Sequence, residues 1–137
     1  SPTGREIAFT SDRGGTPQIY IMDADGGNSH RLTYSGDYNT SASWSPQGDG
    51  IAYTCRNGQG FLKLCVISSN GQQWIEIPTK GSWDDESPSW SPNGKEIVFT
   101  SNRFGKSQIY AVRTDGTGLI RLPSDEGKNT RPVWAPR

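Results

Sequence analysis

Membrane spans, basic patches and long apolar runs are all missing from this sequence. Only 31% of its 137 residues are hydrophobic, and no apolar run approaches the roughly 20 residues needed to cross a bilayer. Lys plus Arg and Asp plus Glu each number 14, so the formal net charge is zero and no basic cluster favours a nucleic-acid backbone. We therefore expect neither membrane insertion nor a nucleic-acid partner.

Helical periodicity is also missing, because no stretch repeats its apolar residues every three to four positions. The 17 Gly and 9 Pro residues instead interrupt the chain at short intervals. Such residues break helices and form the tight turns that join short strands. The composition therefore predicts an all-β fold.

The sequence offers little from which to build a catalytic or metal site. It contains one histidine, His30, and no G-x-S-x-G motif, so a Ser–His–Asp triad is unsupported. His30 cannot form a zinc site with two distant cysteines. The acids at residues 84–86 are consecutive, and side chains of an extended chain point in alternating directions rather than toward one ion. We expect a non-catalytic chain with no cofactor and no metal.

The two cysteines, Cys55 and Cys65, lie ten residues apart on the arms of one predicted hairpin. In an oxidising compartment they could bridge adjacent strands, if the register allows it. The alternative is a pair of free thiols that pack as small apolar side chains. Because cross-strand disulfide geometry is demanding, the sequence favours free thiols.

What the sequence does contain is an internal repeat. Three copies of one segment begin, 44 and 46 residues apart, at Ser1, Ser45 and Ser91. A tryptophan stands immediately before each later copy, at Trp44, Trp90 and Trp134, and residues 135–137 start a fourth copy. The repeats therefore divide one domain, residues 1–137, into the segments 1–44, 45–90 and 91–134.

Each copy contains four short strands. In the third copy, residues 97–100 and 108–112 are rich in β-branched and aromatic residues and are separated by the polar turn SNRFGKS. The chain then passes through LIRLP and a longer loop to a strand that ends in RPVW. Four strands in about 40–45 residues are typical of a β-propeller blade.

Three blades do not close a ring, because propellers typically have about four to eight. The sequence starts without Met, just after the position of an inner strand, so we expect a piece of a longer protein. We predict three four-stranded blades that form half of a six-bladed ring, with the inner strand of the first blade supplied by a C-terminus. The ring is closed either by missing blades or by a homodimer.

The repeat resembles that of the TolB propeller family. The pattern SPxGxxIxFTSxRxGxxQIYxxxxDG, preceded by xPxW, is matched almost throughout by residues 1–26 and 91–116, and WDDESPSWSPNG and the ending RLPSDEGKNTRPVWAPR also resemble the family. The middle copy departs from the pattern, with CRNGQGFLKLC in place of SDRGGTPQIY and one additional residue. The resemblance covers essentially the whole chain and implies the last three of six blades.

This resemblance implies a non-catalytic periplasmic scaffold of the Tol–Pal cell-envelope system, with a signal peptide and an N-terminal α/β domain outside these 137 residues. The family's propeller binds the peptidoglycan-associated lipoprotein over one mouth of the ring. One alternative is a propeller that gates the active site of a prolyl-oligopeptidase-like serine peptidase. Another is a lectin-like ring that binds a small ligand with Tyr38 and Trp83.

In an up-and-down blade, the turns between the second and third strands share one mouth with the blade-to-blade connections. The candidate partner-binding residues on this mouth are Tyr38, Asn39, Thr40, Trp83, Asp84, Asp85, Glu86, Arg103, Phe104, Asn129, Thr130 and Arg131. Exposed aromatics mixed with Arg and carboxylates are typical of protein-binding surfaces. The alternative is ordinary polar loops, although the resemblance favours Glu86 and its neighbours.

The repeated tryptophans, Trp44, Trp90 and Trp134, have two possible roles. They could form a platform on which a ligand stacks. Their recurrence at one repeat position instead favours packing between blades, because a buried aromatic contributes much of a small blade's apolar contact. We therefore interpret them as structural residues.

Overall fold

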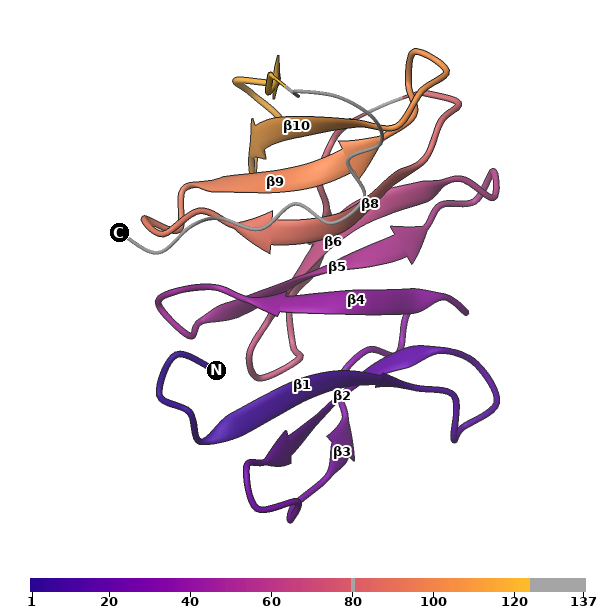
Figure 1. The fold of residues 1–137 in the computed structure, drawn as a ribbon. Coiled ribbons are helices and arrows are strands. Elements are labelled where there is room, and N and C mark those ends of the chain that lie inside the picture. The colour runs from indigo at the N-terminus through magenta and orange to yellow at the C-terminus, as the bar shows by residue number, and fades with distance from the viewer. Residues whose placement is uncertain (80, 124–137) are drawn as a thin grey trace.

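A computed structural model gives the fold and describes residues 1–79 and 81–123 (Figure 1). These residues form eleven strands in three antiparallel sheets and contain no helix. The sheets follow one another along the chain, and Figure 1 shows them stacked from the indigo N-terminal end to the yellow C-terminal end. The all-β architecture of successive blades is therefore as predicted.

Within each sheet the strands are hydrogen-bonded in chain order. The first blade contains β1 (Glu6–Ser11), β2 (Gln18–Asp23) and β3 (His30–Arg31). The second contains β4 (Asn39–Trp44), β5 (Gly50–Arg56), β6 (Leu62–Ser68) and β7 (Trp74–Glu76). The third contains β8 (Asp85–Trp90), β9 (Glu96–Ser101), β10 (Gln108–Arg113) and β11 (Ile120–Arg121).

The second and third blades have four strands each, and the first has three among the described residues, as predicted for a sequence that starts just after the position of an inner strand. The strand that precedes β1 in repeat order is missing there, which leaves β2 as the only strand paired with β1 in the described part of the chain. We call β4 and β8, the first strands of the complete blades, the inner strands. The predicted strand at RPVW, with Asn129, Thr130, Arg131 and Trp134, lies outside the described residues.

The hydrophobic core lies between the sheets, in two clusters. Side chains of β5 alternate between them, because successive residues of a strand point to opposite faces. Ile51 and Tyr53 belong to the cluster shared with the first blade, and Ala52 belongs to the cluster shared with the third. Trp44 packs against the first cluster and Trp90 against the second. The middle blade is thus covered on both faces.

Each inner strand contains a bulge, and the bulge of β8 is bonded to the preceding blade. Ser41 and Ser87 have positive φ angles of 59° and 55°, and the pairing of β4 and β8 with the next strand shifts at these positions. A bulged residue leaves the ladder, so its N–H is available elsewhere. The N–H of Ser87 donates to Thr54 Oγ1 of the second blade at 3.0 Å. Three residues later, Trp90 Nε1 donates to the Ser43 carbonyl at 3.0 Å.

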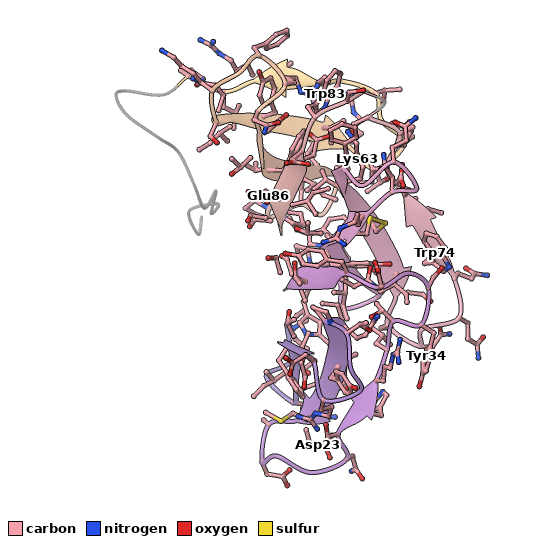
Figure 2. The ribbon with its side chains drawn as sticks, turned by 90° about the vertical axis from the view of Figure 1, so that its right-hand side faces the viewer. Asp23, Tyr34, Lys63, Trp74, Trp83 and Glu86 are labelled. Carbon is pink, nitrogen blue, oxygen red and sulfur yellow. A yellow bond between two sulfur atoms is a disulfide. The ribbon has the colours of Figure 1, made fainter. Side chains whose placement is uncertain are left out.

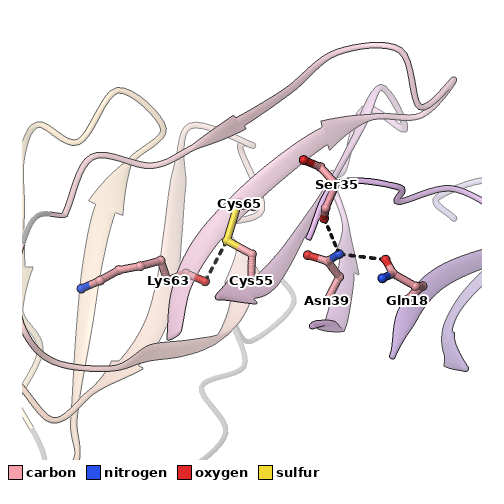
Figure 3. Close-up of a disulfide and its surroundings, with 6 residues drawn as sticks. All are labelled: Gln18, Ser35, Asn39, Cys55, Lys63 and Cys65. Atoms are coloured by element: carbon pink, nitrogen blue, oxygen red, sulfur yellow. Dashed lines mark hydrogen bonds between the residues drawn. A yellow bond between two sulfur atoms is a disulfide. The ribbon is translucent and has the colours of Figure 1, made fainter. Parts of the chain in front are cut away.

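The expectation of free thiols is wrong, because Cys55 and Cys65 form a disulfide (Figure 3). In the β5–β6 pair Cys55 lies opposite Lys63, and Cys65 lies opposite Tyr53. The cysteines are therefore diagonal neighbours with side chains on one face, and their Cα atoms are 6.0 Å apart, within the range a disulfide spans. This register follows from the shape of the 57–61 turn, which the sequence pattern alone does not specify.

Reduction of this disulfide is expected to destabilise the middle blade. The bond closes a loop across ten residues of sequence, so Cys55→Ser/Cys65→Ser should lower the free energy of unfolding by about 2–3 kcal/mol, measured by urea denaturation. Intact mass should rise by two hydrogens on reduction. Reducing agent should leave the double variant unchanged, and an unchanged wild-type mass would contradict the disulfide.

Candidate protein-interaction face

One end of the blades carries both the turns inside blades and the connections between them. Antiparallel strands alternate in direction, so the β1–β2, β5–β6 and β9–β10 turns emerge at the same end as the β3–β4 and β7–β8 connections. We call this surface the loop face, and it consists of residues 12–17, 32–38, 57–61, 77–79, 81–84 and 102–107 with the adjoining strand ends. It contains most of the candidates that the sequence indicated.

Asp85, the first residue of β8, is a fully buried carboxylate at this end of the blades. Its Oδ2 accepts hydrogen bonds from Thr79 Oγ1 at 2.7 Å and Trp83 Nε1 at 3.3 Å, and lies 3.5 Å from Lys63 Nζ. Its Oδ1 accepts from Arg103 Nη2 at 3.1 Å. A buried charge is tolerated when it is paired and hydrogen-bonded, as here. Asp85 therefore holds the loops together and is not accessible to a partner.

Lys63 is the cation that joins the second blade to this network. Its side chain is 2% exposed, although it belongs to a strand of apolar residues. Nζ donates to the Thr79 carbonyl at 3.2 Å and lies 5.0 Å from the centre of the Trp83 ring (Figure 2). Lys63 and Thr79 were not among the residues that the sequence indicated. Their positions in the repeat could have indicated them, because Lys63 corresponds to Gln18 and Thr79 corresponds to Thr33.

Trp83 is enclosed between two cations. The Arg103 guanidinium lies 5.0 Å from the centre of the Trp83 ring, on the opposite blade from Lys63, and 4.7 Å from that of Tyr110. The ring also packs on Gly81, where any side chain would collide with it. Half-buried Trp83 is thus a fixed part of the connection between the second and third blades rather than a free stacking platform.

The first junction uses the same positions with neutral groups (Figure 3). Asn39, which corresponds to Asp85, donates from Nδ2 to Gln18 Oε1 at 2.8 Å and to the Ser35 carbonyl at 2.9 Å. Thr33 Oγ1 donates to the same Gln18 oxygen at 2.7 Å. Buried Gln18, Thr33 and Asn39 therefore replace Lys63, Thr79 and Asp85. One repeat position can close a junction with an amide network or with an ion pair.

Tyr38 and Arg56 lie on the loop face above this neutral network. The Arg56 guanidinium covers the Tyr38 ring at 4.6 Å and is 3.9 Å from Asp37. Arg56 and Asp37 have side-chain exposures of 41% and 73%, so their ion pair contributes little to stability. Tyr38 is half-buried, and Thr40 follows in β4. This part of the face remains open to solvent.

Two further acids flank buried Asp85. Asp84 joins two blades, since its Oδ1 accepts from the Leu62 N–H at 2.9 Å and its own N–H donates to Asn102 Oδ1 at 2.9 Å. Burial, and then the charge of Asp84, raise the pKa of Glu86 above its usual value. Figure 2 shows Glu86 on the opposite side of the blades from Trp74 of the outer strand β7. Within the described part of the chain, Glu86 is therefore a carboxylate without an ion-pair partner.

The candidate residues fall into three groups. Asn39, Asp85 and Arg103 are internal supports, with Asn39 and Asp85 buried and the Arg103 side chain 6% exposed. Those that present surface are Tyr38, Thr40, Trp83, Asp84, Glu86 and Phe104. Phe104 is the most open, at 81% exposure on the β9–β10 turn. Asn129, Thr130 and Arg131 lie outside the described residues.

Across residues 1–79 and 81–123, no group of three or more His, Cys, Asp or Glu side chains is placed to hold a metal ion. The same residues contain no helix of membrane-spanning length and hydropathy. The loop face is thus a surface of aromatic and acidic side chains over buried polar networks.

The repeat equivalence of the two junctions makes a double-variant test possible. Asp85→Asn leaves buried Lys63 without its counter-charge and should lower the free energy of unfolding by about 3–5 kcal/mol. Adding Lys63→Gln recreates the Gln–Thr–Asn network of the first junction and should recover much of that loss, measured by urea denaturation. Exposed Glu76→Gln is the control and should change stability by less than about 0.5 kcal/mol. A double variant no more stable than Asp85→Asn would contradict the equivalence.

Comparison with known proteins identifies the family. The family model of the TolB beta propeller domain matches residues 1–137. The Tol-Pal system protein TolB of Xanthomonas oryzae pv. oryzae is 38% identical over 113 residues, which cover 82% of this chain and 26% of that protein. The chain therefore spans about a quarter of the length of this relative.

Solved structures agree with the sequence match. The crystal structure of TolB from Acinetobacter baumannii superposes with a TM-score of 0.87 at 36% identity, and covers all of this chain and 34% of that one. An oligogalacturonate lyase in complex with manganese has a TM-score of 0.67 at 14% identity over 88% of this chain and 37% of that one, a likeness of fold alone. From its repeats, its blades and these matches, the chain belongs to the TolB β-propeller family.

Proposed function

We propose that the chain is a non-catalytic, protein-binding part of a TolB-type propeller, which acts in the periplasm within the Tol–Pal system. The proposed partner is a peptidoglycan-associated lipoprotein that docks on the loop face. Two findings support this proposal, namely membership of the TolB family and a relative named as a Tol-Pal system protein. A fold does not determine function, so the argument must rest on the site.

Glu86 is the observation that carries the proposal. Its pKa is raised by burial and by neighbouring Asp84, and no ion pair compensates the ionised carboxylate among residues 1–79 and 81–123. Perturbed groups of this kind concentrate at functional sites. A basic side chain of the partner would supply the missing charge. Phe104 and Tyr38 add aromatic surface at the same end, a mixture typical of protein interfaces.

The support beneath this surface favours a rigid docking site. Asp84 is bonded to both neighbouring blades, and Asp85 anchors the connection from below through Thr79 and Lys63. A surface held in one conformation loses little entropy when a partner binds. A non-catalytic role also fits the position of His30, which is exposed and has its Nδ1 3.1 Å from the Asn28 carbonyl oxygen, rather than beside a nucleophile.

The loop face would be presented by a complete ring of blades. We propose that the repeats 1–44, 45–90 and 91–134 act as one domain and that two copies form a homodimeric ring of six blades. Six is the only multiple of three within the usual range of about four to eight blades. The loop faces of both copies then surround one mouth of the ring.

Calorimetric titration with the soluble domain of a peptidoglycan-associated lipoprotein tests the docking proposal. Wild type should release or absorb heat on binding, and Glu86→Gln should weaken the affinity about fivefold or more, because it removes a charge from the contact. Exposed Lys95→Ala, in the β8–β9 turn at the opposite end of the blades, is the control and should bind as wild type. No heat with a folded, assembled wild type would refute the proposal.

The affinity should also depend on pH in a defined direction. The raised pKa of Glu86 means that this carboxyl still carries a proton at a pH where an ordinary glutamate is ionised. A basic partner favours the ionised form, so the affinity should increase as pH rises through the pKa of Glu86 and then level off. Glu86→Gln should remove this increase.

A further inference from the structure

A cleft opens between the first and second blades, on the side where the outer strands lie. Its volume is about 370 Å³, within the range of about 300–1,000 Å³ that small-molecule sites occupy. Residues 32–35, which follow β3, form one wall, and β5, β6, β7 and the β6–β7 turn form the other. Every lining residue lies between positions 32 and 74, so the cleft is formed entirely by described residues.

The sequence of the middle repeat creates this space. In the first and third blades a Phe and a Tyr lie opposite each other on the two central strands, and their rings stack. These pairs are Phe9–Tyr20, with ring centres 5.8 Å apart, and Phe99–Tyr110, with ring centres 6.0 Å apart. In the second blade Tyr53 lies opposite Cys65, so the disulfide to Cys55 takes the place of the second ring. The smaller disulfide leaves a hollow of about 80 Å³, which shares Ser35, Tyr53 and Trp74 with the cleft.

Tyr53 brings a hydroxyl to the cleft at a position where the other blades have Phe. Tyr53 is 2% exposed, and its hydroxyl makes no hydrogen bond among residues 1–79 and 81–123. The fully enclosed polar atoms without a partner there belong to Trp44, Thr100 and Tyr110. The Tyr53 hydroxyl is thus not fully enclosed, and the space that it meets is the cleft. Burial raises the pKa of Tyr53 above its usual value, so the hydroxyl keeps its proton and needs a partner that accepts it.

Two aromatic side chains stand at the rim of the cleft. Tyr34 is 72% exposed and Trp74 is 49% exposed, and Figure 2 shows both on the same side of the blades. Arg31 holds the Tyr34 ring, since its guanidinium lies 4.6 Å from the ring centre and its Nε donates to the Thr33 carbonyl. A ring-shaped ligand gains contact area from such aromatic faces.

The polar groups of the cleft carry no charge. Its lining consists of apolar and neutral polar residues, and the polar ones include Ser35 and Gln72. The adjoining hollow is lined in part by Arg56 and Glu76, whose charges are opposite in sign. Phosphate and carboxylate ligands are recognised by clustered cationic groups, which this lining does not supply. The cleft therefore favours a neutral ligand that can form hydrogen bonds.

We propose that this cleft binds a neutral carbohydrate, with one face of a pyranose ring against Trp74 and a sugar hydroxyl bonded to Tyr53. A pyranose has an apolar C–H face, which packs on the negative face of an aromatic ring, and a rim of hydroxyl groups. A purely apolar side chain of a protein partner would leave the Tyr53 hydroxyl unpaired. The carbohydrate site is separate from the docking surface around Glu86, which Figure 2 shows on the opposite side of the blades from Trp74.

Titration with three neutral disaccharides, cellobiose, maltose and N,N′-diacetylchitobiose, tests the proposal. At least one should shift an indole N–H signal in the NMR spectrum in a saturable way, and Trp74→Ala should weaken its affinity about tenfold or more. Ile75→Ala is the matched control and should bind as wild type, because Ile75 is 52% exposed on the same strand but does not line the cleft. No saturable shift with any of the three and folded wild type, or an equal loss in both variants, would overturn the proposal.

Tyr53→Phe tests the hydroxyl while keeping the ring. Phe9 and Phe99 occupy this position in the other blades, so the fold should tolerate the change. The affinity for the disaccharide that binds wild type should fall about fivefold, because one hydrogen bond to the sugar is lost. The midpoint of urea unfolding should not fall, since the hydroxyl has no partner in the described part of the chain. Unchanged sugar affinity, or a loss of stability without a loss of affinity, would contradict the assigned role.

A neutral aromatic amide distinguishes a carbohydrate site from a site for a protein side chain. N-acetyltryptophanamide offers an apolar ring without a rim of hydroxyl groups, so it should bind more weakly than the best disaccharide in the same NMR titration. Saturable, Trp74-dependent binding of this amide alone would show that the cleft receives a protein side chain, and would refute the carbohydrate proposal.

Discussion

The contact of each inner strand with the blade before it determines the rest of this structure. A four-stranded blade exposes two apolar faces and is stable only when its neighbours cover them. The bulge at Ser87 and the indole of Trp90 place one polar group each against the second blade, where Thr54 and Ser43 accept them. These two bonds fix the distance and the register between sheets, so the apolar clusters on both sides of β5 can pack.

The loop face follows from the same contact, because each inner strand begins there. Its first residue is Asn39 at one junction and Asp85 at the other, and both are buried beneath the connecting loops. The amide network and the ion pair occupy equivalent positions, and each pairs the buried polar groups at its own junction. The ion pair brings Lys63, Arg103 and three acids to one small region, where burial and Asp84 raise the pKa of Glu86. In our account, the buried groups that stabilise the junctions between blades also position the side chains of the loop face.

The repeat made the fold predictable, since the Trp positions and the alternation of residues 97–100 locate the strands to within a few residues. Directions along the strands also placed the turns and connections at one end. Register was not predictable, which is why the Cys55–Cys65 disulfide was missed. Nor did the sequence distinguish supporting from exposed loop residues. Asp84, Asp85 and Glu86 are consecutive acids, yet they are respectively a link between blades, a buried anchor and a surface group. That difference arises from the bulged path of β8 and from Lys63, far away in sequence.

The central claim is that the three blades form half of a six-bladed ring, which we propose two copies of the chain complete. The molar mass in solution, measured by light scattering over a range of concentrations, tests this most directly. The account predicts a stable species of twice 15.0 kDa that dissociates only on dilution. A folded species that stays at 15.0 kDa across the whole range would contradict it, because the two end blades would then each keep an apolar face uncovered.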